Sequence, residues 1–555
     1  MNGPLGVVVQ ALLAVLALSA AESGLESETA RPWIVPLLFL VPHALALVGR
    51  KALGVRARFL ARLRTLVALS PFPLYIVATV ACGWRLWVFE GLAAEASSLA
   101  FFGVLVALAP YAVLAVAAID AAARLSPASP KRRRALRSFQ LRMLLLAALP
   151  LAVFVIGASL LSLSERLRLE MEGVSLWGAL FLAFFLGLLL RGLPTFLRRI
   201  WACEPLPAGP LRARLEELAR VAGFRYRELC LWNTGGLMPN AMIAGVWPRS
   251  RVVLLTDVLL SILDPEEVQA VFAHEVGHAK KGHALLFLAM TCATFMTAHL
   301  LAMAIDPSGG WVALGVAVPT LIAWAVAFGW LSRRIELDAD LYCHELTGSS
   351  LALQSAFASM GGGERSSWRH FSAPRRVAFL QRAAVDPTFV QAFRRRLRRI
   401  AVASVTVFCI AGALQAGTVL TAFPAERVAV ELSLGRHAHA AARARGIGDL
   451  PEESTRLLAT ITAAGAAIDH ADRTAAAAAC GQHAARALEE REWAAARDWL
   501  RLAELAGNES AGRCALALEL GGEERWQDAR AALEGDESVP ARAIARWLTR
   551  AARSQ

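Results

Sequence analysis

The residues best suited to chemistry lie in one short string, Ala273-His274-Glu275-Val276-Gly277-His278. Two histidines four residues apart project from the same face of an α-helix, because one turn takes about 3.6 residues. Imidazole nitrogens at that spacing can bind one Zn²⁺ together. Glu275 lies at the rim of such a site, which suits a general base that activates water beside the metal. The string therefore predicts His274 and His278 as zinc ligands and Glu275 as the catalytic residue.

An HExxH string also arises by chance in long chains, so the residues around it decide its meaning. The preceding segment 264–267, Asp-Pro-Glu-Glu, has an N-cap residue, a proline for the first helical position and first-turn carboxylates. Apolar residues then recur at helical spacing, at Val268, Val271, Phe272 and Val276. This context predicts that the motif lies on a helix, as the chemistry requires.

A catalytic zinc usually takes three protein ligands, and the third is predicted to be Glu336. Asp340 follows four residues later, so both carboxylates face one way on a helix. Asp340 is expected to accept the second N–H of a ligand histidine and to fix its tautomer. As the alternative, these acids pair with Arg333 and Arg334 on a solvated helix face. His283 is interpreted as a polar residue near the site, because its spacing from His278 is one residue too short for a third-histidine motif.

Composition indicates a membrane protein. Of the 555 residues, 56% are hydrophobic, which is more than average usage in soluble domains. The net charge of +13 could suit a nucleic-acid binder, but many basic residues lie in loops between apolar runs and so favour membrane topology instead. Eight cysteines occur without a CxxC pair, which argues against a zinc ribbon or a dense disulfide framework. Usage rich in alanine and arginine and poor in lysine favours a bacterial source.

Apolar runs predict about nine membrane spans, each long enough or nearly so to cross roughly 30 Å of hydrocarbon. The first could also be the core of a signal peptide, but it lacks preceding lysine or arginine and is interpreted as an uncleaved span. The nine runs cover approximately residues 4–20, 33–48, 66–88, 99–121, 144–163, 176–193, 285–305, 311–331 and 400–421.

Basic residues in the loops at 50–64 and 131–137 predict which face of the membrane each segment occupies. Lysine and arginine collect on the cytoplasmic side, so alternation places segments 194–283 and 332–399 in the cytoplasm. An even number of spans separates His278 from Glu336, and the chain therefore returns Glu336 to the face that carries the histidines. The same alternation places the residues after 421 outside the cytoplasm.

The cytoplasmic piece before the motif is expected to form an amphipathic helix at 211–222 and strands at 228–232, 240–245 and 251–256. A small sheet packed on the zinc helix would offer an edge to which an extended substrate could add as a strand. Alternatively, these strands merely cover the helix.

The tail from 423 onwards reads as successive amphipathic helices. Segments 492–500 and 525–533 look alike and lie about 33 residues apart, a spacing similar to that of tetratricopeptide-like hairpins. A plain helical bundle is the alternative. Cys480 and Cys514 are the two cysteines of this tail, and they could form a disulfide outside the cytoplasm or remain buried thiols.

Together these motifs resemble membrane zinc metallopeptidases of the type I CAAX prenyl protease and HtpX family. The resemblance covers roughly residues 211–380. It rests on Asn240-Ala241, the string 274–278, and Ser332-Arg333-Arg334 with Glu336, Ala339 and Asp340. His370, Arg375 or Arg376, and Leu380 look like a weaker downstream element.

This resemblance implies zinc endopeptidase activity, with His274, His278 and Glu336 as ligands and Glu275 as base. It also implies that Asn240 and Ala241 lie on the substrate-binding edge and that Arg333 or Arg334 lies near the site. The chain departs from HtpX-like members in its six spans before the catalytic part, where those have about two, and in its last span and tail. The prenyl-protein substrate therefore does not carry over.

The sequence thus predicts a mainly α-helical polytopic membrane protein with a small β-sheet beside a zincin-type HExxH helix and a C-terminal helical domain. The expected domains are an N-terminal bundle (1–193), a zinc metallopeptidase domain (194–399), a last span (400–422) and an extracytoplasmic helical-repeat-like domain (423–555). The predicted function is zinc-dependent endopeptidase cleavage of membrane or misfolded proteins at the cytoplasmic face, in a bacterial inner membrane. The expected partners are a protein or peptide substrate, the lipid bilayer and a protein bound by the tail, without nucleic acid. The alternative function is a non-enzymatic membrane scaffold or assembly factor that acts through the tail.

Overall fold

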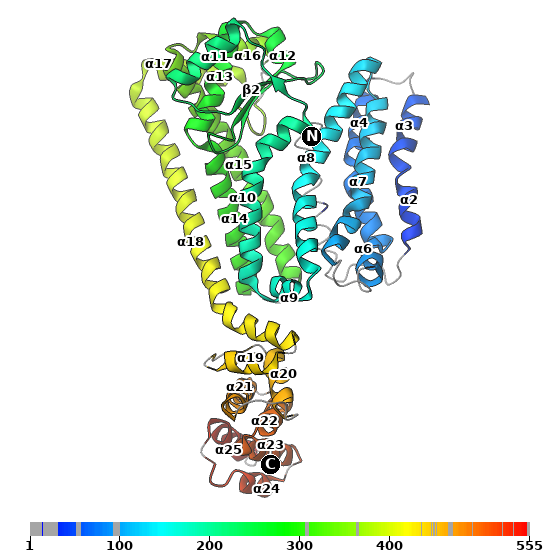
Figure 1. Ribbon diagram of the computed structural model, residues 1–555, viewed down its shortest axis with the longest axis vertical. Helices are drawn as coiled ribbons and strands as arrows, with labels where there is room; N and C mark the ends of the chain where they lie inside the picture. Colours follow the sequence, from blue (N-terminus) through cyan, green and yellow to red (C-terminus); the bar gives the residue numbers. More distant parts are fainter. Residues whose placement is uncertain are drawn as a thin grey trace. The chain divides into compact units, whose positions relative to one another are not determined.

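The protein is described by a computed structural model whose chain divides into two compact units (Figure 1). Unit 1 comprises Met1–Leu160 and Ala183–Gln415, and unit 2 comprises Leu161–Leu182 and Ala416–Gln555. The structure describes residue 14 and residues 31–51, 57–92, 100–305, 310–361, 366–434, 436–445, 447, 450, 452–463, 470–490, 492–523, 525–536 and 538–551.

Long apolar helices dominate the described part of the chain, and 8 of them are long and apolar enough to cross a membrane. They match the predicted runs from the second to the ninth. The predicted first span, at 4–20, lies outside the described residues except for residue 14. The candidate spans are Pro32–Gly49, Arg58–Ala81, Phe102–Arg124, Pro130–Ser162, Ser175–Ile200, His283–Ile305, Gly315–Thr347 and Pro387–Ser433.

The first part of unit 1 is a helical bundle with buried aromatic contacts, such as the edge-to-face pair of Tyr75 and Tyr111 with ring centroids 5.9 Å apart. In chain order the elements are η2 (Pro32–Ile34), α2 (Val35–Leu38), α3 (Val41–Lys51), α4 (Ala57–Leu69), α5 (Pro71–Ile76), η3 (Val77–Ala81), α6 (Trp84–Leu86), η4 (Trp87–Leu92), α7 (Ala100–Arg124), α8 (Pro130–Ser162) and α10 (Ser175–Ile200), the last two reaching into unit 2. Some spans are interrupted: the candidate span Arg58–Ala81 consists of three consecutive elements, α4, α5 and η3.

A small mixed sheet follows α10, in the strand order β1-β2-β4-β3. Its members are β1 (Glu204–Pro205), β2 (Glu228–Trp232), β3 (Ala241–Ala244) and β4 (Val252–Thr256). The three predicted strands are confirmed, and β1 is an addition. β2 pairs with β4 in parallel, whereas β3 pairs with β4 antiparallel and has no second strand partner among the described residues. β3 is therefore an edge strand.

The HExxH helix is α13 (Pro265–Lys280), and its start follows the predicted capping pattern. The Glu267 carboxylate accepts a hydrogen bond from the backbone N–H of Asp264 at 3.0 Å. The same carboxylate accepts one from the Ser355 hydroxyl, which ties α13 to α16 (Leu351–Ser359). The predicted apolar stripe is confirmed, because its members Val268, Val271, Phe272 and Val276 are all buried.

Helix α13 is surrounded by other elements of unit 1. It contacts α11 (Pro210–Val221), β3, α14 (His283–Ile305), α15 (Gly310–Thr347) and α16. Figure 1 shows α11, α13, α16 and β2 gathered at one end of the long helices α14 and α15. The chain leaves α13, runs along α14 and returns along α15, and this return brings the end of α15 back against α13. Unit 1 also contains α12 (Asp257–Ile262), α17 (Ala373–Val385) and the first part of α18 (Pro387–Ser433).

Unit 2 is entirely helical within its described residues. Residues 161–182, which the sequence places with the N-terminal bundle, here pack with the tail, since Arg427 pairs with Glu170 and the Glu426 carboxylate accepts the Ser175 N–H. Each of the two similar segments begins a helix, one of 13 and one of 7 residues, and Trp493 and Trp526 both contact Trp547. The helices are α9 (Glu165–Gly173), α19 (His437–Ala444), α20 (Glu452–Ala463), α21 (His470–Glu489), α22 (Trp493–Leu505), α23 (Glu509–Gly522), α24 (Trp526–Ala532) and α25 (Val539–Ala551). Cys480 and Cys514 are buried free thiols.

At Gly277, α13 packs so closely against α15 that there is little room for a side chain. A Cβ atom built on Gly277 would lie 3.1 Å from Tyr342 Cβ and 3.2 Å from Ala339 Cα. We predict that Gly277→Val separates the two helices and costs about 1–3 kcal/mol, as overpacking of a tight contact does. Thermal unfolding of the purified protein in detergent, followed by circular dichroism, would show a lowered midpoint.

Gly315 on α15 is the matched control, since a Cβ there has nothing within 4 Å. Gly315→Val should leave the midpoint close to that of the unsubstituted protein. Equal losses in both variants would contradict the close-contact argument.

Candidate metal centre

Three predicted ligand side chains converge in the structure. His274 Nε2 and His278 Nε2 lie 3.2 Å apart. Glu336 on α15 places Oε2 3.6 Å from His274 Nε2 and Oε1 3.7 Å from His278 Nε2. Ligands about 2.0–2.2 Å from a tetrahedral zinc lie about 3.3–3.5 Å from one another, so these separations suit one ion. Within the described chain, this is the one group of at least three histidine, cysteine or acidic residues close enough to hold a metal.

The second nitrogen of each histidine has its own partner. His274 Nδ1 lies 2.9 Å from Asp340 Oδ1. His278 Nδ1 lies 2.9 Å from His283 Nδ1, and His283 Nε2 lies 3.2 Å from Asp338 Oδ2. When Asp340 accepts a hydrogen bond from His274 Nδ1–H, and Asp338 accepts one from His283 Nε2–H, His283 Nδ1 can accept a hydrogen bond from His278 Nδ1–H. In this arrangement Nδ1 of both His274 and His278 carries hydrogen, and both Nε2 atoms keep a lone pair for a metal.

Sequence reasoning anticipated the place of Asp340 but missed the pairing of His283 with Asp338. His283 follows the turn at Gly282, whose φ is +68°, and begins a new helix. Spacing along α13 therefore could not show that it turns back to His278. Asp338 lies two residues from both Glu336 and Asp340 and points to a different side of α15, where α14 packs.

The donor set fits a metal cation. Two imidazole nitrogens with lone pairs facing each other at 3.2 Å repel unless a positive charge lies between them. Burial disfavours charge on His274, but its hydrogen bonds to Asp340 and Glu336 outweigh this and raise its pKa to about 10. Burial and the neighbouring His274 lower the pKa of His278 to about 3. The pair thus holds a single positive charge, a role that zinc would take over with two nitrogen ligands and a carboxylate.

Glu275 lies on α13 between the two ligand histidines and is partly exposed. Burial of its carboxyl group, reinforced by the charge of Glu336 and opposed by that of His274, raises its pKa to about 7. A carboxylate with a pKa near neutrality can take up and release a proton under ordinary conditions.

Two residues of the predicted downstream element complete the surroundings. Arg376 on α17 forms two hydrogen bonds to the Asp340 carboxylate, at 2.8 Å from Nε and 2.5 Å from Nη2, and lies 3.7 Å from Glu336. His370 places Nδ1 3.2 Å from Glu336 Oε2 and remains half-exposed. The sequence left Arg375 and Arg376 as alternatives, and the structure brings Arg376 to the acids.

The other predicted residues lie around this centre in different ways. Asn240 precedes the edge strand β3, which begins at Ala241 and contacts α13. Arg333 stacks over Phe371 at 5.7 Å and Arg334 over Trp330 at 3.5 Å. Neither arginine forms an ion pair with Glu336 or Asp340 in the described structure. The alternative in which the acids serve only a solvated ion-pair network is therefore not what the structure shows.

Comparison with known proteins matches residues 205–384 to peptidase family M48. This stretch is similar to that family and includes the three residues of the metal centre, His274, His278 and Glu336.

Similar proteins include two named "Protease HtpX homolog". That of Herminiimonas arsenicoxydans is 29% identical over 27% of this chain and 56% of its own length. That of Aeropyrum pernix is 33% identical over 28% of this chain and 53% of its own length. The chain thus spans about half the length of these relatives. A "CAAX prenyl protease 1 homolog" of Arabidopsis thaliana is 33% identical over 17% of this chain and 22% of its own. The crystal structure of S. mikatae Ste24p aligns at 15% identity with a TM-score of 0.33, covering 64% of this chain and 100% of that one.

Arg376 supports the metal centre by compensating the charge of Asp340, whose side chain has no exposed surface. We predict that Arg376→Met destabilises the protein by about 3–5 kcal/mol, because it leaves a buried carboxylate without its cation. Thermal unfolding in detergent, with and without added zinc, would measure the loss.

Arg382→Met provides the control on the same helix. Arg382 is exposed and stacks on Phe389, and its loss should cost no more than about 1 kcal/mol. A melting profile for Arg376→Met that matches that of Arg382→Met would refute the compensating role.

Proposed function

We propose that this protein is a membrane-embedded zinc-dependent endopeptidase that cleaves membrane or misfolded proteins at the cytoplasmic face. The observation that carries the proposal is the convergence of His274, His278 and Glu336 beside Glu275. A scaffold that only recruits partners needs neither the three ligands nor a carboxylate of raised pKa between them.

The chemistry follows from these positions. Zinc bound there would polarise the scissile carbonyl and make water more acidic. Glu275 accepts the proton of the attacking water and passes it to the leaving amine, and burial, which raises the pKa of its carboxyl group, favours uptake of that proton. His370 is half-exposed beside Glu336, and we assign to it a hydrogen bond to the substrate carbonyl oxygen as charge develops there.

The edge strand β3 supports a binding mode for the substrate. β3 contacts α13, the helix that carries the two histidines. It is the last strand in the sheet order, so among the described strands one of its two edges is unpaired. An extended peptide added along Ala241–Ala244 would form backbone hydrogen bonds irrespective of its sequence. Asn240 and Ala241 are the residues proposed to contact it. This mode suits an enzyme that cleaves unfolded segments.

The positions of basic residues support a cytoplasmic active site in a bacterial inner membrane. Lysine and arginine crowd the loop at 131–137 and the segment 394–399. Two candidate spans, α14 and α15, separate His278 from Glu336, so both residues return to one face. With one further span, the proposed alternation leaves the C-terminal helices outside the cytoplasm.

A hollow in unit 2 supports a protein partner for the C-terminal helices. It has a volume of about 820 Å³ and is lined by four glutamates, of which Glu452 pairs with Arg456, and by a single arginine. The four glutamates are Glu426, Glu452, Glu490 and Glu492, and the arginine is Arg486. Carboxylates in such number favour a basic segment of a partner protein. This observation also keeps a scaffold function as the second candidate.

We predict that Glu275→Gln retains about one zinc per chain yet loses cleavage by roughly 10²–10⁴-fold, the usual contribution of a general base. Glutamine keeps the size of the side chain but cannot accept the proton. Zinc content would be measured by elemental analysis and cleavage with casein or a membrane substrate.

Glu266→Gln is the control, because Glu266 lies in the first turn of the same helix with a 65% exposed side chain. It should cleave at the unsubstituted rate. Unchanged cleavage by Glu275→Gln would refute the mechanism, and an unsubstituted protein that binds no zinc would favour the scaffold.

The proposed topology predicts that a reporter fused after Gln555 lies outside the cytoplasm. Alkaline phosphatase, which folds where disulfides form, should be active there, whereas green fluorescent protein should be dark. A fluorescent fusion with inactive phosphatase would overturn the proposed orientation.

A further inference from the structure

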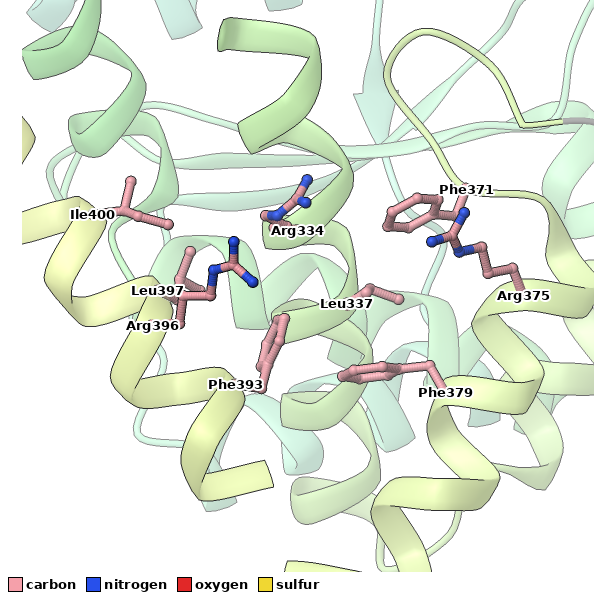
Figure 2. Close-up of a pocket in the computed structure, with 9 residues that line it drawn as sticks. All are labelled: Arg334, Leu337, Phe371, Arg375, Phe379, Phe393, Arg396, Leu397 and Ile400. Carbon is pink, nitrogen blue, oxygen red and sulfur yellow. The ribbon is translucent and has the colours of Figure 1, made fainter. Parts of the chain in front are cut away.

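A separate pocket lies between α15, α17 and α18 (Figure 2). Its volume is about 230 Å³, below the roughly 300–1,000 Å³ of pockets for drug-sized ligands. Arg334 and Leu337 line it from one face of α15, whereas the ligand Glu336 is turned about 200° from Arg334 around that helix. The pocket is therefore distinct from the metal centre.

Three arginines, Arg334, Arg375 and Arg396, bring positive charge to this pocket. None of them has a carboxylate within 4.0 Å among the residues that the structure describes. The charge of Arg334 is repelled by that of Arg396 and by those of Arg333 and Arg375. An uncompensated group of like charges indicates that an anion completes the site.

Neighbouring arginines on the same helices do have acidic partners. Arg394 on α18 lies 2.7 Å from Glu345, and Arg376 on α17 lies 2.5 Å from Asp340. The lack of carboxylates thus belongs to the pocket and is not a general shortage of acids nearby. Aromatic rings hold two of its guanidinium groups instead, since Arg334 lies 3.5 Å from the Trp330 ring centroid and Arg375 lies 4.2 Å from that of Phe371. Stacking leaves N–H groups at the edges of the guanidinium available to a ligand.

The rest of the lining is apolar. Six of the nine lining residues are aromatic or aliphatic, and Figure 2 shows Leu397 and Ile400 together along α18. A small inorganic anion would leave these side chains uncovered. The mixture favours a ligand that joins an anionic group to a hydrocarbon chain.

The pocket lies where two candidate spans change from apolar to basic. On α15 the apolar run ends at Leu331, and Arg333 and Arg334 follow. On α18 the basic segment 394–399 precedes Ile400, after which large apolar side chains such as Val402 are exposed. This level is the boundary between headgroups and hydrocarbon, where lipid phosphates lie.

We propose that this pocket binds the phosphate of an anionic phospholipid headgroup. Arg334, Arg375 and Arg396 donate hydrogen bonds to the phosphate oxygens, and an acyl chain lies against Leu397 and Ile400. Basic pockets between spans on the cytoplasmic side commonly hold such headgroups. The site goes beyond the proposed peptidase activity and does not depend on it.

Native mass spectrometry of the full-length protein in detergent tests this site. Phosphatidylglycerol and phosphatidylcholine of identical acyl chains are titrated separately, and we expect tighter binding of phosphatidylglycerol. Arg396→Gln should weaken that binding by about fivefold and Arg334→Gln/Arg375→Gln/Arg396→Gln by on the order of 100-fold, if each basic group contributes as at a membrane surface. Binding of phosphatidylcholine should not change.

Arg395→Gln/Arg398→Gln/Arg399→Gln is the matched control. It also removes three positive charges, but at residues of α18 that do not line the pocket. It should retain most phosphatidylglycerol binding, and circular dichroism and zinc content should show that both triple variants fold. Equal loss in the two triple variants would mean diffuse attraction and overturn the site. Arg396→Gln, a single exposed change on α18, preserves the test if the pocket triple variant does not fold.

Competition separates the lipid from other anions. Inorganic phosphate offers the same charged group without acyl chains, and an acidic peptide offers carboxylates. Both should displace phosphatidylglycerol only at large excess. Displacement by either at concentrations comparable to the lipid would assign the pocket to that ligand and overturn the lipid proposal.

Discussion

The close approach of two imidazole nitrogens is the constraint on which the metal centre of this molecule depends. His274 and His278 turn their Nε2 atoms toward each other at 3.2 Å, and when both nitrogens carry a lone pair a shared cation is what makes that arrangement favourable. A proton can serve this role for one histidine at a time, as the opposite pKa shifts of the two side chains show. A divalent metal serves both at once. The carboxylate of Glu336 then supplies negative charge to the same centre.

Burying so many charges requires each one to be compensated locally. Asp340 is enclosed between His274 and Arg376, and Asp338 between His283 and the more distant Arg394. The residues in these contacts lie on five different helices, α13, α14, α15, α17 and α18, so the centre forms only when the tertiary structure does. The compensation also explains why the acids of α15 do not pair with the adjacent Arg333 and Arg334. Those arginines lie on other sides of the helix and stack on aromatic rings instead.

Features that repeat at the period of a helix or strand could be predicted from the sequence. The spacing of His274 and His278, the stripe from Val268 to Val276, and three strands all follow from local periodicity, and the structure shows each of them. The approach of Glu336 could be predicted as well, because two spans must return the chain to one face.

Contacts that depend on tertiary packing were beyond such reasoning. His283 reaches His278 only because the chain turns at Gly282, and no periodicity links them. The choice of Arg376 over Arg375 depends on how α17 is rotated against α15. The two-residue strand β1 is too short to produce a pattern, and the packing of residues 161–182 with the tail rests on single ion pairs and hydrogen bonds. The pocket beside Arg334 likewise joins three helices that are separate in sequence.

Glu336, Asp338 and Asp340 all belong to α15, a helix of 38 residues in which the predicted apolar run at 311–331 precedes them. The rotational phase of the three acids is therefore set by every residue between the lipid-facing part and the metal centre. One inserted apolar residue would leave the hydropathy of the span unchanged but would turn the acids by about 100° relative to it. The number of residues in this span thus encodes the geometry of the centre, and its length is constrained independently of bilayer thickness.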